Sequence, residues 1–224
     1  MVPADVLAKY LTLDRFKIKI FTAPNTICTN NVAMNDRIRT RALDMHNYRR
    51  SQLALNKVIK NTGRLLPGAR NMRKLVYDCN LEISARARAE SCASTANPNP
   101  GTNIVENLTR FSKSTVTTRV AAMQRAVRRW WKQVRRVPGF GMNAIFRPKH
   151  QNGKIMSFIK MAWADTPSVG CAVSSRRFCG NFWTVVCQYS VNGFIPNSNV
   201  YLTGTACANC PTGTTCVQAE GLCA

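Results

Sequence analysis

Apolar residues return with helical spacing in three stretches of the chain. From Asn35, a residue type suited to capping a helix, to about residue 56, apolar side chains recur every three or four positions. Small residues share one face across 78–93. The longest pattern covers 114–136, where valines and paired tryptophans keep to one face until Pro138 ends it. These spacings predict three helices.

Strand-forming residues dominate the second half of the chain. The segments 155–163, 168–174 and 182–190 are predicted strands, and the last is rich in Phe, Trp, Thr and Val. Helices followed by consecutive strands indicate an α+β fold with an antiparallel sheet. Alternating apolar residues and lysines over 16–20 predict one further short strand. After Tyr201, the abundance of Gly, Thr and Cys predicts a small tail stapled by its own cysteines.

The composition is that of a basic globular protein. Lys and Arg number 32 and Asp and Glu 10, so the formal net charge is +22. Apolar residues make up 45% of the chain, and no run approaches the ~18 apolar residues of a membrane-spanning helix. Arginine outnumbers lysine, which favours sulfate, phosphate or carboxylate partners, because guanidinium binds such forked acceptors with two hydrogen bonds.

The ten cysteines fit five disulfides and an oxidising, extracellular environment. Zinc is the alternative, since Cys207 and Cys210 form a C-x-x-C pair that Cys216 and Cys223 follow. The last two are spaced too widely for a usual zinc ribbon, so disulfides are favoured. Residues 1–21 lack the apolar segment of a signal peptide, so a secreted form would be one from which a leader has been removed.

The chain has two histidines, His46 and His150. Catalysts that need several histidines are therefore disfavoured, because His is the usual base near neutral pH. His46 lies on the apolar stripe of the first predicted helix, which indicates a structural side chain inside the core.

Motifs along the chain resemble those of the CAP superfamily, which includes cysteine-rich secretory proteins, insect venom antigens and plant pathogenesis-related proteins. His46–Arg50 resembles its H-N-x-x-R motif, and Val105–Asn107 is similar to its G-E-N. Its two C-terminal signatures resemble the segments Met161–Thr166, Val169–Cys171 and Val185–Tyr189. The cysteine-rich tail resembles the hinge of the nematode venom allergen-like, or Ancylostoma-secreted, members.

The resemblance implies an α-β-α sandwich with a central antiparallel sheet, and a secreted protein. It divides the chain into an N-terminal extension (1–34), a CAP domain (35–203) and a cysteine-rich hinge (204–224). By family analogy, the expected disulfides are Cys28–Cys79, Cys92–Cys179, Cys171–Cys187, Cys207–Cys216 and Cys210–Cys223. The third of these also joins neighbouring predicted strands.

The family's central cleft holds two histidines and two glutamates that bind zinc in many members, and this chain departs from that set. Glu106 matches the first glutamate, but Gln133 replaces the second. Ser157 and Lys160 occupy the segment of the second histidine, and no histidine follows Cys92. The departures imply a cleft with no metal, no cofactor and no catalytic residue. Glu106 then either pairs with Lys160 or is a buried acid bonded to the backbone.

Asn107, Leu108 and Thr109 form a sequon for N-glycosylation. The sequon overlaps the G-E-N-like segment, which the resemblance places at the cleft. Glycosylation of Asn107 is therefore disfavoured.

The third predicted helix carries a basic face. At about 100° per residue, its apolar residues gather within about 60° of one direction, and five cations lie opposite with no carboxylate among them. Like charges three or four residues apart weaken a helix. The face is either a solvated surface or a docking strip for a polyanion. Its residues are Arg125, Arg128, Arg129, Lys132 and Arg136.

An extracellular setting favours sulfated polysaccharide, an anionic lipid surface or an acidic host protein over nucleic acid, the usual polyanion inside a cell. The basic face also lacks aromatic residues that would stack bases. Family members are reported to bind sterols or fatty acids, and apolar residues of the loop 138–146 either contact such a ligand or only cover the core. They are Phe140, Met142, Ile145 and Phe146.

Three functions follow as alternatives. The favoured one is a secreted, non-catalytic parasite effector that binds a host extracellular polyanion or acidic protein and modulates the host response. The second is a sterol or fatty-acid carrier. The third is a protease or metal hydrolase, which the missing cleft ligands leave with little support.

Overall fold

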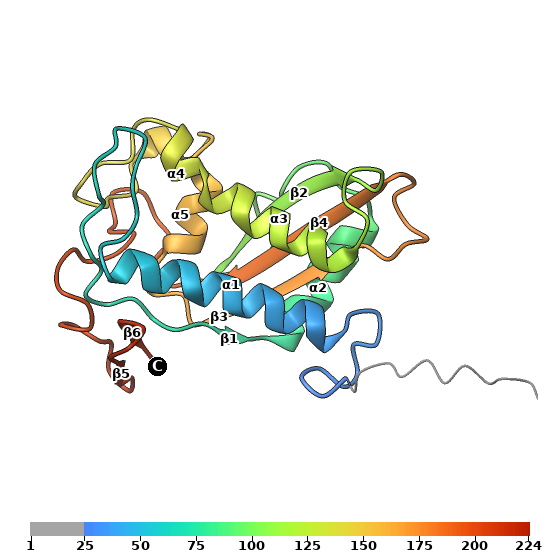
Figure 1. The fold of residues 1–224 in the computed structure, drawn as a ribbon, viewed down its shortest axis with the longest axis horizontal. Helices are drawn as coiled ribbons and strands as arrows, with labels where there is room; N and C mark the ends of the chain where they lie inside the picture. The colour runs from blue at the N-terminus through green and yellow to red at the C-terminus, as the bar shows by residue number, and fades with distance from the viewer. Residues whose placement is uncertain (1–24) are drawn as a thin grey trace, which may run out of the picture.

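Residues 25–224 are described by the computed structural model of the chain (Figure 1), so the strand expected at 16–20 lies outside the described residues. The described chain places a four-stranded sheet between helical layers, which confirms the expected sandwich. Helix α2 (Cys79–Glu90) packs on one face, against β3 and β4. Helices α1 (Asp36–Ala54) and α3 (Arg119–Trp131) pack together on the other. Within this range, no helix is long and apolar enough to cross a membrane.

The sheet is mixed, which corrects the expectation of an antiparallel one. Strand β4 (Phe182–Ser190) lies between β2 (Ile104–Ser112) and β3 (Ser168–Val173) and runs antiparallel to both. Strand β1 (Val76–Tyr77) completes the order β1-β3-β4-β2 and pairs in parallel with β3. The long helical connection between β1 and β3 permits this pairing, which a tight turn does not.

Polar caps determine where the predicted helices begin. The Asn35 side chain accepts a hydrogen bond from the Ile38 N–H at 3.0 Å, as expected. The third helix begins at Arg119 and not at 114, because the Thr118 side chain accepts from the Ala121 N–H at 3.1 Å. It also ends early, at Trp131, and a separate turn of helix, α4 (Gln133–Arg136), follows.

The segment 155–163 is helical, so the strand predicted there is wrong. Helix α5 (Met156–Ala162) buries Phe158, Ile159, Met161 and Ala162, which return at helical spacing on one face. A short apolar run of this length does not distinguish a buried strand from a buried helix by periodicity. Ser157 and Lys160 therefore lie on a helix, α5, which contacts the edge strand β2.

A glycine on β3 allows α2 to lie close to the sheet. A Cβ atom at Gly170 would lie 2.3 Å from the Glu82 backbone nitrogen. Cys171 of β3 and Cys187 of β4 lie opposite each other and form a disulfide, as expected for cysteines on neighbouring strands.

All five expected disulfides are present. They join Cys28 to Cys79, Cys92 to Cys179, Cys171 to Cys187, Cys207 to Cys216, and Cys210 to Cys223. The sulfurs of Cys207, Cys210 and Cys223 lie within 4.8 Å of one another, a spacing that alone would suit a metal. Because each of these sulfurs is in a disulfide, none is a thiolate ligand, and the zinc alternative is not supported.

The cysteine-rich tail is a hairpin that packs on the domain. Its strands β5 (Cys216–Val217) and β6 (Leu222–Cys223) pair antiparallel. The Cys223 N–H donates to the Met72 carbonyl and the Cys223 carbonyl accepts from the Lys74 N–H, both at 2.8 Å. Leu222 is fully buried, so the tail adds to the core.

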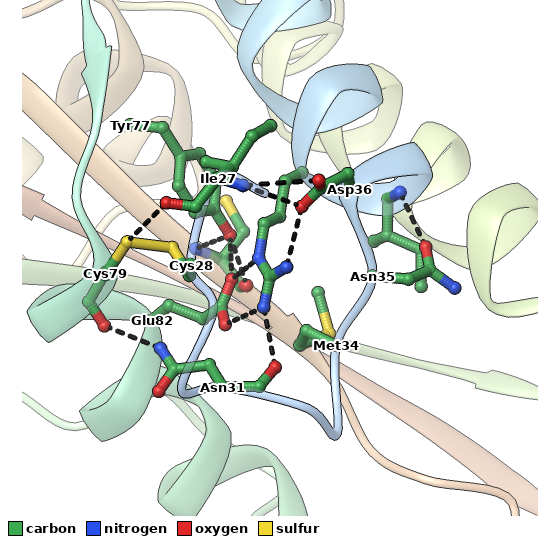
Figure 2. Close-up of polar contacts among 12 residues, drawn as sticks. Ile27, Cys28, Asn31, Met34, Asn35, Asp36, Tyr77, Cys79 and Glu82 are labelled. Carbon is green, nitrogen blue, oxygen red and sulfur yellow. Dashed lines mark hydrogen bonds and ion pairs between the residues drawn. A yellow bond between two sulfur atoms is a disulfide. The ribbon is translucent and has the colours of Figure 1, made fainter. Parts of the chain in front are cut away.

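A buried charged network joins the start of α1 to α2 (Figure 2). The Arg39 guanidinium is bound by the Glu82 carboxylate at 2.6 and 2.7 Å and by Asp36 at 2.8 Å. Glu82 also accepts from the Tyr77 hydroxyl at 2.6 Å, and the Asn31 carbonyl accepts from Arg39 at 2.7 Å. Each buried charge of this network therefore has a partner, and together they bind the first turn of α1 to the sheet side of α2.

Candidate functional site

The basic face predicted from the sequence is exposed in the structure. Its five residues lie on α3, on α4 and at the junction Lys132 between them, and all five side chains are exposed. Within residues 25–224, none of them forms an ion pair with a carboxylate. The face therefore presents unneutralised positive charge to solvent.

Helix α1 widens this positive surface. Arg41 and Arg49 of α1 and Arg128 of α3 line a hollow of about 240 Å³, in which Asp44 is the one acidic side chain of the described residues. Burial lowers the pKa of Arg49, and the positive charges of Arg128 and Arg135 lower it further, while Tyr48 opposes the shift. Arg49 and Arg135 therefore lie near the basic face. The sequence did not indicate Arg49, because helical periodicity does not say which helices pack side by side. It did not indicate Arg135, because the count of 100° per residue assumed one helix where α3 ends and α4 begins.

The remnant of the family cleft begins with Glu106, a buried residue of β2. Its carboxylate accepts from the Asn97 N–H at 2.8 Å and from the Gln188 side-chain amide at 2.9 Å, and the Arg88 guanidinium lies 3.5 Å away. The expected partner Lys160 donates instead to the Glu106 backbone carbonyl at 2.8 Å. Glu106 is thus a buried acid held by hydrogen bonds.

The other cleft residues are linked to one another and to β2 through α5. The Gln133 side-chain oxygen accepts from the Phe158 N–H at 3.0 Å, and the Ser157 carbonyl accepts from the Asn107 side-chain amide at the same distance. Burial lowers the pKa of Lys160, and the Glu106 charge opposes that shift. Strand β2 and helices α4 and α5 therefore meet at one cleft.

This donor set does not fit the zinc of the family cleft. Zinc requires several unprotonated His, Cys or carboxylate ligands at about 2 Å. Here the Glu106 carboxylate is already hydrogen-bonded, the Gln133 oxygen is engaged by backbone, and the Lys160 cation repels a metal. The chemistry of these side chains argues against a divalent cation.

Both histidines are buried and hydrogen-bonded. His46 Nδ1 donates to the Ala42 carbonyl at 2.7 Å, so Nε2 is the acceptor of the Tyr189 hydroxyl at 2.9 Å. Burial lowers the pKa of His46 to about 4, and Arg50 adds to this, against the opposing bond to Ala42. His150 accepts from the Arg147 N–H and contacts the Gly139 carbonyl. His46 is therefore structural, as expected.

The apolar loop residues divide into two pairs. Phe140 and Phe146 are each 1% exposed, and they pack edge-on against Phe158 and Trp163 respectively. Met142 and Ile145 remain half-buried at the edge of the core. The two phenylalanines thus cover the core, and only the other pair presents apolar surface.

The sequon lies inside the protein. Asn107 is 1% exposed, and its side-chain nitrogen donates to the Ser157 carbonyl at 3.0 Å and to the Tyr189 hydroxyl at 3.3 Å. A glycan on this nitrogen would break both bonds and has no room in the folded domain. The structure therefore argues against glycosylation of Asn107.

The sandwich, the disulfides and the cleft define a class of protein. Residues 43–189 match the Cysteine-rich secretory protein family (CAP), and the chain belongs to this family. It is similar to Ancylostoma secreted protein of Ancylostoma caninum, with 34% identity over 89% of this chain and 47% of that protein. It is also similar to Hookworm platelet inhibitor 1 of the same species, with 27% identity over 85% of this chain and 83% of that protein. The chain thus spans about half the length of the first relative.

Solved structures show the same fold. The crystal structure of Na-ASP-1 has a TM-score of 0.78 at 31% identity, and the match covers 89% of this chain and 50% of that chain. NaASP2, crystallised with Zn²⁺, has a TM-score of 0.77 at 28% identity, over 88% of this chain and 100% of that chain. BmVAL-1 has a TM-score of 0.76 at 25% identity. These similarities confirm the resemblance to the Ancylostoma-secreted and venom allergen-like group.

Proposed function

We propose that the chain is a secreted, non-catalytic CAP protein, a parasite effector that binds a polyanion or acidic protein in the extracellular environment of a host. The observation that carries the proposal is the exposed basic face, whose five cations have no carboxylate partner among residues 25–224. Five disulfides and the relationship to Ancylostoma secreted protein support an extracellular setting.

The shape of the basic face suits an extended sulfated chain. From Arg125 to Lys132 the cations extend over about 10 Å along α3, at ~1.5 Å for each helical residue, and Arg136 follows on the separate turn α4. Arg pairs with two sulfate oxygens at once through charge-assisted hydrogen bonds. Heparan sulfate is an extracellular polyanion with this chemistry, and its binding should weaken as salt screens the exposed charges.

Two charge-matched variants test this proposal. The basic-face variant carries Arg125→Gln, Arg128→Gln and Lys132→Gln, and the control variant carries Lys57→Gln, Arg70→Gln and Arg176→Gln at exposed positions outside α3 and α4. We expect the basic-face variant to lose heparin affinity about tenfold or more, about 1.4 kcal/mol, and the control variant to lose far less. Equal losses, measured by calorimetry at physiological salt, would show that net charge alone binds heparin.

The absence of catalysis is part of the proposal and rests on the histidines. Both are buried and hydrogen-bonded within the fold, so neither is placed to take a proton from a bound substrate. The cleft carboxylate Glu106 is likewise fully engaged. A hydrolase assay with peptide and ester substrates should therefore give no turnover, and turnover abolished by Glu106→Gln would overturn this part of the proposal.

A sterol or fatty-acid carrier is the second proposal, and the half-buried Met142 and Ile145 favour it. These two side chains would supply the apolar contacts, while the buried Phe140 and Phe146 would support the loop. Replacing Met142 and Ile145 with Ser should weaken sterol binding. An unchanged affinity in a fluorescent-sterol titration would remove this site from consideration.

A further inference from the structure

A polar cavity of about 380 Å³ opens beside the edge strand β2. It belongs to the cleft described above, where β2 meets the end of α3 and the beginnings of α4 and α5. Its lining is mostly polar and, among residues 25–224, includes no acidic side chain. The side chains that matter for its chemistry are Thr109, Arg110, Arg129, Gln133 and Ser157.

Two guanidinium groups give the cavity its charge. The Arg110 guanidinium lies over the Phe182 ring, 4.5 Å from its centre, and its Nε atom is buried without a hydrogen-bond partner in the described part of the chain. The Arg129 guanidinium lies 6.0 Å from the centre of the Phe111 ring. Aromatic faces of this kind orient arginine while its N–H groups remain able to bind an acceptor.

Neutral donors complete the lining. The Gln133 oxygen is occupied by the Phe158 N–H, so the amide NH₂ is the end of Gln133 that has no partner among residues 25–224. Trp130 also lines the cavity, and its buried indole N–H has no hydrogen-bond partner in the same range. Thr109 and Ser157 add hydroxyl groups. A buried donor without a partner is costly, so the Arg110 Nε–H and the Trp130 indole N–H favour an acceptor in the cavity.

Glu106, an acid of the same strand β2, does not line the cavity and already has partners. Glu106 accepts from Asn97 and Gln188 and lies 3.5 Å from the Arg88 guanidinium. The Lys160 ammonium, bound to the Glu106 carbonyl, adds another positive charge nearby. The cavity therefore disfavours cations and favours anions.

We propose that this cavity binds an oxyanion, namely a sulfate or phosphate group, either as the free ion or as an ester on a small polar body such as a sugar. The donors present, forked guanidinium, amide N–H and hydroxyl, are those that such groups accept from. The volume is in the range of small-molecule sites and exceeds that of a single ion. The site is separate from the polyanion surface proposed above except for Arg129, and it does not depend on that proposal.

The test follows the indole N–H signal of Trp130 by NMR in the full chain. The chain has four tryptophans. The indole N–H groups of Trp163 and Trp183 already donate to backbone carbonyls, so their signals serve as internal controls. The probes are sodium sulfate, sodium phosphate, N-acetylglucosamine 6-sulfate and unsulfated N-acetylglucosamine, at constant ionic strength. Loss of the signal in Trp130→Phe identifies the resonance.

We expect a saturable shift of the Trp130 signal with sulfate or phosphate groups and none with the unsulfated sugar. Tighter binding of the sulfated sugar than of the free ions would show that the ligand is an ester. Tighter binding of the free ions would show that the ligand is the ion itself. Arg110→Gln should weaken binding about tenfold or more and Arg110→Lys less, while the basic-face variant, which keeps Arg110 and Arg129, should bind unchanged. No saturable shift with any probe, or equal affinity in Arg110→Gln, would overturn the proposal.

Discussion

Arg39 and the arginines of the basic face both lie on helices, but their surroundings are opposite. Arg39 is fully buried and bound by Glu82 and Asp36. The basic-face arginines are exposed, and no carboxylate within residues 25–224 pairs with them. Removing a buried ion leaves its partner uncompensated, whereas an exposed and unpaired charge adds little to stability. Arg39 therefore stabilises the fold, whereas the basic face is available for a ligand.

Arg39→Met should have the largest effect on stability. It leaves the Glu82 carboxylate buried without its cation, which costs about 3–5 kcal/mol of the free energy of unfolding. Arg37→Met on the same helix turn, at an exposed position, should change stability by less than about 0.5 kcal/mol. Urea unfolding with the disulfides intact measures both. A loss of less than about 1 kcal/mol for Arg39→Met would contradict the claim that this buried arginine stabilises the fold.

Acid should weaken the buried region next. His46 has its pKa lowered by burial to about 4, so the unfolded chain takes up a proton first as the pH falls below about 6.5. The free energy of unfolding should have its full value above that pH, and it should fall by on the order of 3 kcal/mol between pH 6.5 and 4. Urea midpoints across this range should fall less steeply in His46→Gln; identical slopes would contradict the assignment.

Asp36 extends the loss to lower pH. Burial raises its pKa, but hydrogen bonds from Thr26, Arg39 and Ile27 outweigh this and lower it to about 2. The unfolded chain therefore protonates this carboxyl first below about pH 4, and the stability it contributes is lost as the pH falls toward 2. Asp36→Asn should flatten the fall of the urea midpoint in that window only. A flatter fall between pH 6.5 and 4 instead would contradict the assignment to Asp36.

The basic-face variant should have the smallest effect on stability. Replacing Arg125, Arg128 and Lys132 with Gln removes repulsion between like charges on the helix and keeps residues of similar helix propensity. We expect the free energy of unfolding to remain the same or to rise by a few tenths of a kcal/mol. A clear loss of stability would mean that these cations stabilise the fold, which would contradict the difference drawn between the basic face and Arg39.

The sequence predicted the parts of the fold that local patterns and family motifs carry. The cap at Asn35, the strand 182–190 and all five disulfide pairs are confirmed. Strand β2 was missed because its buried positions include the polar residues Glu106, Asn107 and Thr109, which hide the apolar signal of a strand. Helix α5 was mistaken for a strand because a short apolar run fits both.

The candidate site shows a similar division. Periodicity alone identified five exposed basic residues of α3, α4 and their junction, although it missed Arg135. It did not place Arg49 beside Arg128, or Arg110 and Arg129 in one cavity, because these pairs come from different elements. It also gave no warning that Phe140 and Phe146 are buried, since a loop's packing depends on the whole fold.

The salt dependence of heparin binding tests the central claim most directly, namely that the basic face is the binding surface. Each cation that contacts the polyanion adds about one to the slope of log affinity against log salt concentration. The basic-face variant should therefore show a slope smaller by about two to three than the unmodified chain, while the control variant at Lys57, Arg70 and Arg176 should keep its slope within about one. Equal reductions in both variants would show that the whole basic surface, and not α3 and α4, binds the polyanion.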